Sequence, residues 1–217
     1  TTNNTVQGNY LGTRLNGTSA LHNGRAGLGV SSNAFYNLIG GTASGAGNLI
    51  SGNFDAGLYL IGTSGNLVQG NIIGADAGGT FTIPNAIEGM YVQYAVTSLI
   101  GGTVPGARNL ISGNSTRGIF LTNSSWNTIQ GNYIGTAADG VSPLGNGNTA
   151  LESADFAGYT LAHEASHSHY HLPDEYYDVE DDPAPECQGN QDDPRCKVLY
   201  GIRICANVDD WHTSLMA

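Results

Sequence analysis

The chain has 217 residues, of which 32 are glycine and only 12% are charged, too few charges for a disordered polyelectrolyte. The 7 lysine and arginine residues against 18 acidic residues give a net charge of −11, so the basic footprint of a nucleic-acid-binding protein is missing. No apolar run approaches the ~18 residues that a membrane-spanning helix needs, so we expect no membrane span.

Two different compositions share the chain. Residues 1–150 hold four acidic and four basic residues and most of the glycine, whereas residues 151–217 hold the other 14 acidic residues and three basic ones. This contrast predicts two units, a repeat domain over 1–148 and a second segment over 149–217. Because the first residues already lie inside a repeat, we expect the sequence to be a piece of a longer protein.

The first unit is built from repeats. The triplet Gln-Gly-Asn begins at Gln7, Gln69 and Gln130, which are 62 and 61 residues apart. A shorter period of 29 to 32 residues separates glycines that each precede an apolar segment: Gly27, Gly57, Gly89 and Gly118. A fixed period of this size is typical of a solenoid.

Each repeat contains about three short segments with strand character. Apolar residues alternate with others, as at Leu58 and Leu60, and glycine and asparagine separate the segments. Three short strands per turn predict a mainly β protein, a right-handed parallel β-helix whose corners use the positive φ that Gly and Asn tolerate. We expect asparagines at equivalent positions to stack into amide ladders: Asn48 with Asn109, and Asn71 with Asn132.

The strings NLIGGT, NLISGN and QGNYIGT give residues 1–148 a family resemblance. The segment resembles bacterial secreted proteins built from parallel β-helix repeats. The resemblance implies that fold and a secreted or cell-surface location, and it implies no activity.

The repeat unit also offers residues for carbohydrate binding. Five aromatic residues are candidates to stack on sugars, for example on cell-surface glycans: Tyr10, Tyr59, Tyr91, Phe120 and Trp126. Asp76 and Asp139 share a register in the repeat, where we expect them to serve turns. Scattered acidic residues do not favour a polysaccharide-cleaving site, which needs clustered carboxylates.

The second unit carries a metal-site motif. His163-Glu164-Ala165-Ser166-His167 matches H-E-x-x-H, and on a helix the two histidines lie one turn apart on one face. Two such imidazoles can bind Zn²⁺, while Glu164 can act as general base toward a zinc-bound water. The preceding segment Phe156–Ala162 is expected to lead into this helix.

A third ligand is expected after the helix ends at Pro173. Asp174 directly follows this break, so its carboxylate can fold back toward the histidines. Glu175 and Glu186 are alternatives, although prolines around Glu186 argue against the helix that such a ligand occupies in other zinc peptidases.

The spacing H-E-x-x-H, six residues, then Asp-Glu-Tyr resembles the metzincin-like zinc peptidases over residues 155–217, in particular the chloride-channel-accessory type. The resemblance implies that His163, His167 and Asp174 are ligands, that Glu164 is catalytic, and that Met216 forms a Met-turn beneath the zinc. The chain lacks space for the sheet that precedes the active-site helix in that family, so the C-terminal unit is expected to be a partial α+β segment.

Two further sites complete the expectations. A disulfide between Cys187 and Cys196 would close a polar loop, and the acidic run 178–182 is a weak candidate for Ca²⁺. Together the patterns predict a secreted zinc-dependent metalloendopeptidase, acting on peptide or protein substrates, on a β-helix scaffold. The alternative is a non-catalytic structural, adhesive or carbohydrate-binding β-helix protein.

Overall fold

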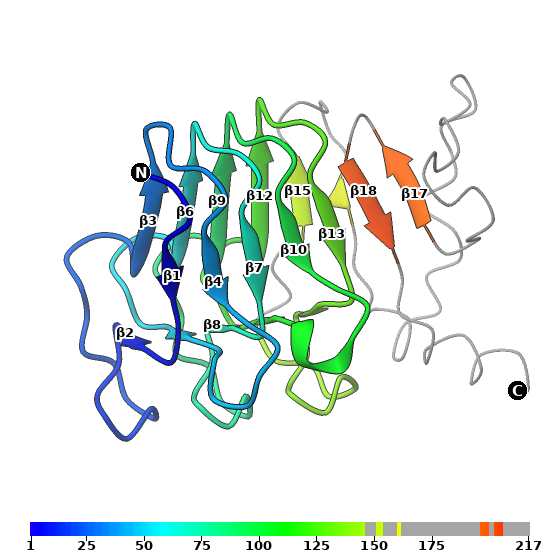
Figure 1. Cartoon of the computed structure of the whole chain (residues 1–217). Coiled ribbons are helices and arrows are strands. Elements are labelled where there is room, and N and C mark those ends of the chain that lie inside the picture. The colour runs from blue at the N-terminus through cyan, green and yellow to red at the C-terminus, as the bar shows by residue number, and fades with distance from the viewer. Residues whose placement is uncertain (146–150, 154–159, 162–195, 200–201, 206–217) are drawn as a thin grey trace, which may run out of the picture.

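The protein is a parallel β-solenoid in a computed structural model that describes residues 1–145, 151–153, 160–161, 196–199 and 202–205. Each coil contributes one strand to each of three sheets, and the coils stack along one axis (Figure 1). This arrangement confirms the predicted parallel β-solenoid of the repeat unit.

The strands are two to four residues long. One sheet has the order β1 (Thr5–Val6), β4 (Leu38–Gly40), β7 (Leu67–Gln69), β10 (Leu99–Gly101), β13 (Thr128–Gln130), β18 (Ile202–Cys205), β17 (Cys196–Leu199). The second has the order β14 (Tyr133–Ile134), β11 (Leu110–Ile111), β8 (Ile72–Ile73), β5 (Leu49–Ile50), β2 (Tyr10–Leu11). The third has the order β16 (Thr160–Leu161), β15 (Leu151–Ser153), β12 (Ile119–Thr122), β9 (Met90–Gln93), β6 (Leu58–Ile61), β3 (Leu28–Ser31). One 3₁₀ helix, η1 (Pro105–Ala107), lies between β10 and β11.

Alternation along each strand sends one set of side chains into the solenoid. In β6, Leu58 and Leu60 are fully buried, while Tyr59 and Ile61 face outward and are half-buried. The same inward positions stack from coil to coil into apolar columns of Leu, Ile, Val and Met. Each such side chain adds about 1.5–3 kcal/mol of burial free energy. Every coil therefore adds a similar stabilising contribution to the core.

Three ladders of asparagine side chains join successive coils at the corners between the strands. In each ladder the side-chain Nδ2 of one asparagine donates to Oδ1 of the asparagine in the next coil, at 2.7–3.0 Å. The members are Asn4, Asn37 and Asn66; Asn9, Asn48, Asn71, Asn109 and Asn132; and Asn23, Asn53, Asn85 and Asn114. The predicted stacking of Asn48, Asn71, Asn109 and Asn132 is confirmed, but the predicted partners are wrong. The four residues form one ladder, in which Asn48 bonds to Asn71, Asn71 to Asn109 and Asn109 to Asn132.

The 61-residue period corresponds to two coils with unlike corners. Alternate coils carry a hairpin between the five-stranded and six-stranded sheets, closed by the antiparallel bridges Thr13–Ala20, Ala75–Thr82 and Thr136–Pro143. Successive hairpins are joined, because Ala77 N donates to the Gly17 carbonyl and Ala138 N to the Gly79 carbonyl, both at 2.9 Å. The intervening coils turn here through the shorter strings Ser-Gly-Asn-Phe and Ser-Gly-Asn-Ser.

Described strands after residue 150 extend the solenoid sheets. β15 pairs in parallel with β12, and β18 pairs in parallel with β13. Thr160 and Leu161 form β16, antiparallel to β15, so the expectation that these two residues lead into a helix is wrong. The physical reason is that the edge of β15 offers backbone partners that a helical segment could not use.

Candidate functional site

The outer face of the six-stranded sheet carries a row of aromatic rings. Tyr59, Tyr91 and Phe120 occupy the same register of β6, β9 and β12, with their side chains pointing away from the core. The ring centroids of Tyr59 and Tyr91 are 5.6 Å apart, and those of Tyr91 and Phe120 are also 5.6 Å apart. The interplanar angles of 76° and 53° are those of tilted or edge-on contacts, which aromatic pairs favour.

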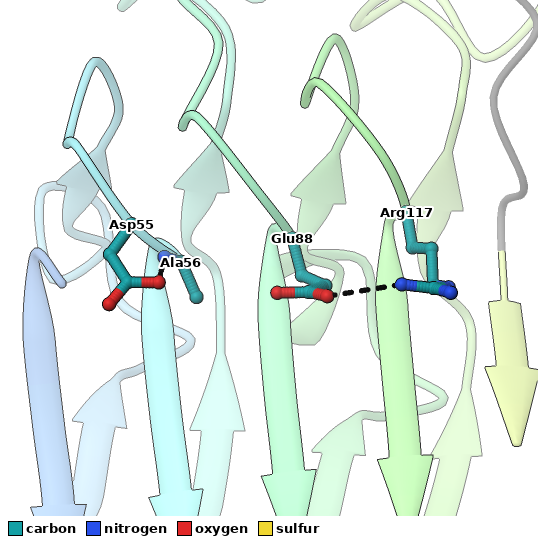
Figure 2. A network of polar contacts seen from close by, with 4 residues as sticks. All are labelled: Asp55, Ala56, Glu88 and Arg117. Carbon is teal, nitrogen blue, oxygen red and sulfur yellow. Dashed lines mark hydrogen bonds and ion pairs between the residues drawn. The ribbon is translucent and has the colours of Figure 1, made fainter. Parts of the chain in front are cut away.

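Charged side chains form a second row, beside the start of the same strands (Figure 2). Arg117 Nη1 lies 3.2 Å from Glu88 Oε1, and the two residues come from neighbouring coils. Asp55, one coil further, accepts a hydrogen bond from the backbone N–H of Ala56 at 3.0 Å. Glu88 is only 6% exposed, so the ion pair is shielded on the carboxylate side.

The surroundings shift two ionisable groups in this row. Burial raises the pKa of Glu88 above its usual range, although the Arg117 charge and hydrogen bond act in the opposite direction. Burial also raises the pKa of Tyr59, helped by a hydrogen bond to Asp55 and by the Asp55 charge. The Tyr59 phenol is therefore a neutral hydrogen-bonding group at every physiological pH.

The two rows form one surface, here called the ladder face: Tyr59, Tyr91, Phe120, Asp55, Glu88 and Arg117. They are linked at one end, because the Arg117 guanidinium lies 4.5 Å from the Phe120 ring centroid. The rings offer apolar contact area, while the carboxylates accept and the guanidinium donates hydrogen bonds. This chemistry suits an extended ligand with both apolar faces and hydroxyl groups.

The other two predicted sugar-stacking residues lie away from this face. Tyr10 is exposed on β2, in the five-stranded sheet. Trp126 lies at the corner that leads from the six-stranded to the seven-stranded sheet. Sequence reasoning thus found the three ladder rings but did not separate them from rings on other surfaces.

Asp76 and Asp139 serve hairpin turns, as expected. Oδ1 of the buried Asp76 accepts from the backbone N–H groups of Thr80 and Phe81 at 2.6 and 2.7 Å. Burial raises the pKa of Asp76, but the backbone N–H bonds outweigh it and hold the pKa below its usual value. The predicted shared register is wrong, because Asp76 is the first residue of its turn and Asp139 the third of its own.

The three charged residues of the ladder face were missed by sequence reasoning. Asp55 lies two residues before Gly57, whereas Glu88 and Arg117 directly precede Gly89 and Gly118. The distance in sequence from each charged residue to Gly57, Gly89 or Gly118 could have shown that these residues lie side by side, because these glycines precede strands that are paired in register.

The described residues do not fit a metal ion. No three His, Cys, Asp or Glu side chains gather in the part of the chain that the structure describes. His22 is the one histidine within residues 1–145, and its Nδ1 lies 2.9 Å from the Gly52 carbonyl oxygen. Its ring also packs on Phe54, with centroids 4.5 Å apart.

The predicted zinc-site residues lie outside the described residues: His163, Glu164, His167, Asp174, Met216, and also Cys187, Glu175, Glu186 and the acidic run 178–182. The backbone of Cys196 is described in β17, where it is paired with Cys205 of β18.

Fold and face together define a parallel β-solenoid with a row of half-buried aromatic rings on its outer face. Comparison with known proteins makes this class more specific, because a family model described as periplasmic copper-binding protein (NosD) matches residues 1–156. The chain belongs to this NosD family. No curated protein and no solved structure matches it. Within the described residues, no helix combines the length and apolar character needed to span a bilayer.

Proposed function

We propose that this protein is a non-catalytic binding solenoid of the periplasm or the cell exterior, and that an extended polysaccharide lies along its ladder face. The single observation that carries the proposal is the row of Tyr59, Tyr91 and Phe120, at one register of three successive coils. The periplasmic description of the family supports the location.

The geometry of the row suits a polymer. Parallel strands repeat at about 4.8 Å, so successive coils place Tyr59, Tyr91 and Phe120 in one line along the axis, which an extended polymer can follow. Apolar sugar faces pack on aromatic rings, and sugar hydroxyls bond to carboxylates and guanidinium groups at the edge. Asp55 and Arg117 supply these groups along one side of the row, while the buried Glu88 holds Arg117 in place through the ion pair.

Binding is preferred here to peptide hydrolysis. The family match ends at residue 156, before His163, and the family is described by metal binding. The predicted peptidase function is therefore replaced by its non-catalytic alternative.

The test is affinity electrophoresis of the full chain through gels that contain β-glucan, xylan or glycol chitin. We expect at least one polymer to retard the wild type, and Tyr91→Ala to weaken the retardation about tenfold, because one ring contact is lost in the middle of the row. Tyr10→Ala, an exposed ring on another sheet, is the matched control and should bind like the wild type. Migration unaffected by every polymer would refute the proposal.

A second candidate function, metal binding by the C-terminal segment, is favoured by the H-E-x-x-H spacing of His163 and His167. We propose that His163, His167 and Asp174 bind one divalent ion, with Glu164 beside it. Imidazole ligands suit both copper and zinc, so the two metals are separate arms of the test.

Metal analysis of the full chain after loading with Zn²⁺ or Cu²⁺ tests this candidate. One ion per chain is expected, and the double variant His163→Ala/His167→Ala should lose it. Glu164→Gln should keep the ion and abolish any peptide hydrolysis, because the general base is removed. Failure to load either metal would end this candidate and would leave the polysaccharide proposal intact.

A further inference from the structure

The corner between the six-stranded and seven-stranded sheets has an unusual backbone. It consists of residues 32–37, 62–66, 94–98 and 123–127, here called the neutral corner, and its coils are in register through the bridges Phe35–Ser64, Ser64–Val96 and Val96–Ser125. The residue that follows each bridge residue has positive φ in every coil: Tyr36, Gly65, Thr97 and Trp126. A second such column directly follows the strands: Ser32, Gly62, Tyr94 and Asn123.

Large aromatic residues occupy three of these left-handed positions. Tyr36, Tyr94 and Trp126 have φ values of 58°, 49° and 58°. Bulky residues reach this region only at a conformational cost, and an aromatic ring lacks the short polar group with which Asn and Asp offset that cost. Glycine adopts it freely, and the chain uses glycine at the equivalent Gly62 and Gly65.

The three rings contribute little to the core. Tyr36 is 64% exposed, Tyr94 58% and Trp126 69%. Tyr36 lies across Gly65 of the next coil, where a Cβ atom would come within 2.5 Å of the ring. Backbone strain at residues that contribute little to the core is a mark of functional positions, since the surrounding structure must hold it.

The surroundings of these rings are uncharged. None of the residues in the four segments is acidic or basic, and their polar residues are Ser, Thr and Asn. Such a surface has hydroxyl and amide groups for sugar hydroxyls, and no cation for a phosphate, sulfate or uronic acid. The outward residues Gln93 and Thr122 lie between this corner and the rings of Tyr91 and Phe120 along β9 and β12.

We infer that the neutral corner is a second glycan-binding surface, specific for an uncharged polysaccharide, with Tyr36, Tyr94 and Trp126 as its stacking residues. The inference rests on the proposed function, and it specifies that the polysaccharide is uncharged. Tyr36 and Trp126 belong to the column after the bridges and Tyr94 to the column after the strands, and both columns run along the solenoid axis, so the polymer follows the same direction as on the ladder face.

The test is the triple variant Tyr36→Gly/Tyr94→Gly/Trp126→Gly in the full chain, with thermal unfolding and affinity electrophoresis as its two readouts. Glycine relieves the strain of the positive φ, which offsets the conformational entropy that it adds to the unfolded chain, so the melting temperature should stay close to that of the wild type. Retardation by neutral β-glucan, xylan or glycol chitin should weaken at least about tenfold, since three ring contacts are lost. Polygalacturonate, an anionic polymer, should retard neither the wild type nor the variant.

The outcomes separate this inference from the proposed function. If Tyr91→Ala loses binding and the triple glycine variant keeps it, the corner is not a binding surface and the ladder face still is. A fall in melting temperature would assign the three rings a structural role and overturn the inference. Stronger retardation by polygalacturonate than by the neutral polymers would overturn the assigned ligand class.

Discussion

The interior and the outer face of this solenoid obey different rules. Inside, equivalent positions hold nearly the same residue in every coil, as in the ladder that contains Asn48, Asn71 and Asn109. Outside, equivalent positions differ, as at Gly29, Tyr59 and Tyr91 in the six-stranded sheet. The repeat therefore maintains the coil, whereas departures from it mark the surface on which we place function.

The largest effect should come from breaking the interior at a glycine. Gly40 has a φ of 80°, and a Cβ there would lie 1.9 Å from the Gln69 carbonyl oxygen of the next coil. We expect Gly40→Ala to lower the free energy of unfolding by more than about 3 kcal/mol, measured by urea denaturation. The control is Gly62→Ala, with φ of 60° and open space at Cβ, which should cost about 1 kcal/mol. An equal loss of unfolding free energy in the two variants would mean that the close approach of neighbouring coils at Gly40 does not constrain the residue there.

The second largest effect is expected from the loss of an asparagine inside a ladder. Asn71 Nδ2 bonds to Asn109 Oδ1 and to the Ile39 carbonyl, and Asn71 Oδ1 accepts from Asn48. Asn71→Ala leaves buried groups unsatisfied, so we expect a loss of about 3 kcal/mol. Asn9→Ala, at the exposed end of the same ladder, should cost less than about 1 kcal/mol in the same denaturation series. A loss at Asn9 as large as that at Asn71 would contradict the role of burial.

The turn carboxylate Asp76 should make stability depend on pH. Its pKa is depressed in the folded chain, so its contribution is present above the unfolded value near 3.8 and is lost as pH falls through the folded value. Asp76→Asn should destabilise by about 2 kcal/mol at pH 7, and the difference should shrink in acid. Unfolding titrations between neutral and acid pH measure this difference, and a gap that widens in acid would contradict the sign.

The smallest effect is expected at Glu88, on the outer face. Burial raises its pKa, so the ionised form costs stability and the Arg117 ion pair offsets part of that cost. Glu88→Gln should therefore change stability at pH 7 by less than about 1 kcal/mol. Relative to this variant, the wild type should lose stability as pH rises through the usual carboxylate range, which thermal unfolding at several pH values can measure. The opposite trend would show that the ion pair outweighs burial.

The sequence predicted the interior better than the surface. The repeat period and the alternation of apolar residues were enough to predict the coils. Inward residues such as Leu58 and Leu60, and the stacked asparagines, recur at the same position of each repeat. The ladder of Asn23, Asn53, Asn85 and Asn114 escaped notice, since loops of unequal length hide its register.

Surface positions depend on contacts between coils that no local pattern encodes. The pairing of Glu88 with Arg117 needs a register fixed 29 residues away, and the left-handed corner of Tyr36 is normally a glycine position. Likewise, the two strands β15 and β18 join sheets started far earlier in the chain, which the change of composition at residue 150 did not suggest.

Titration calorimetry of the full chain with a soluble neutral polysaccharide tests the central claim most directly. The account predicts saturable binding by the wild type, and an affinity at least about tenfold weaker in Tyr59→Ala/Tyr91→Ala/Phe120→Ala while the solenoid stays folded by circular dichroism. Wild-type affinity in this folded variant would contradict the claim that the outer face of the six-stranded sheet is the binding surface.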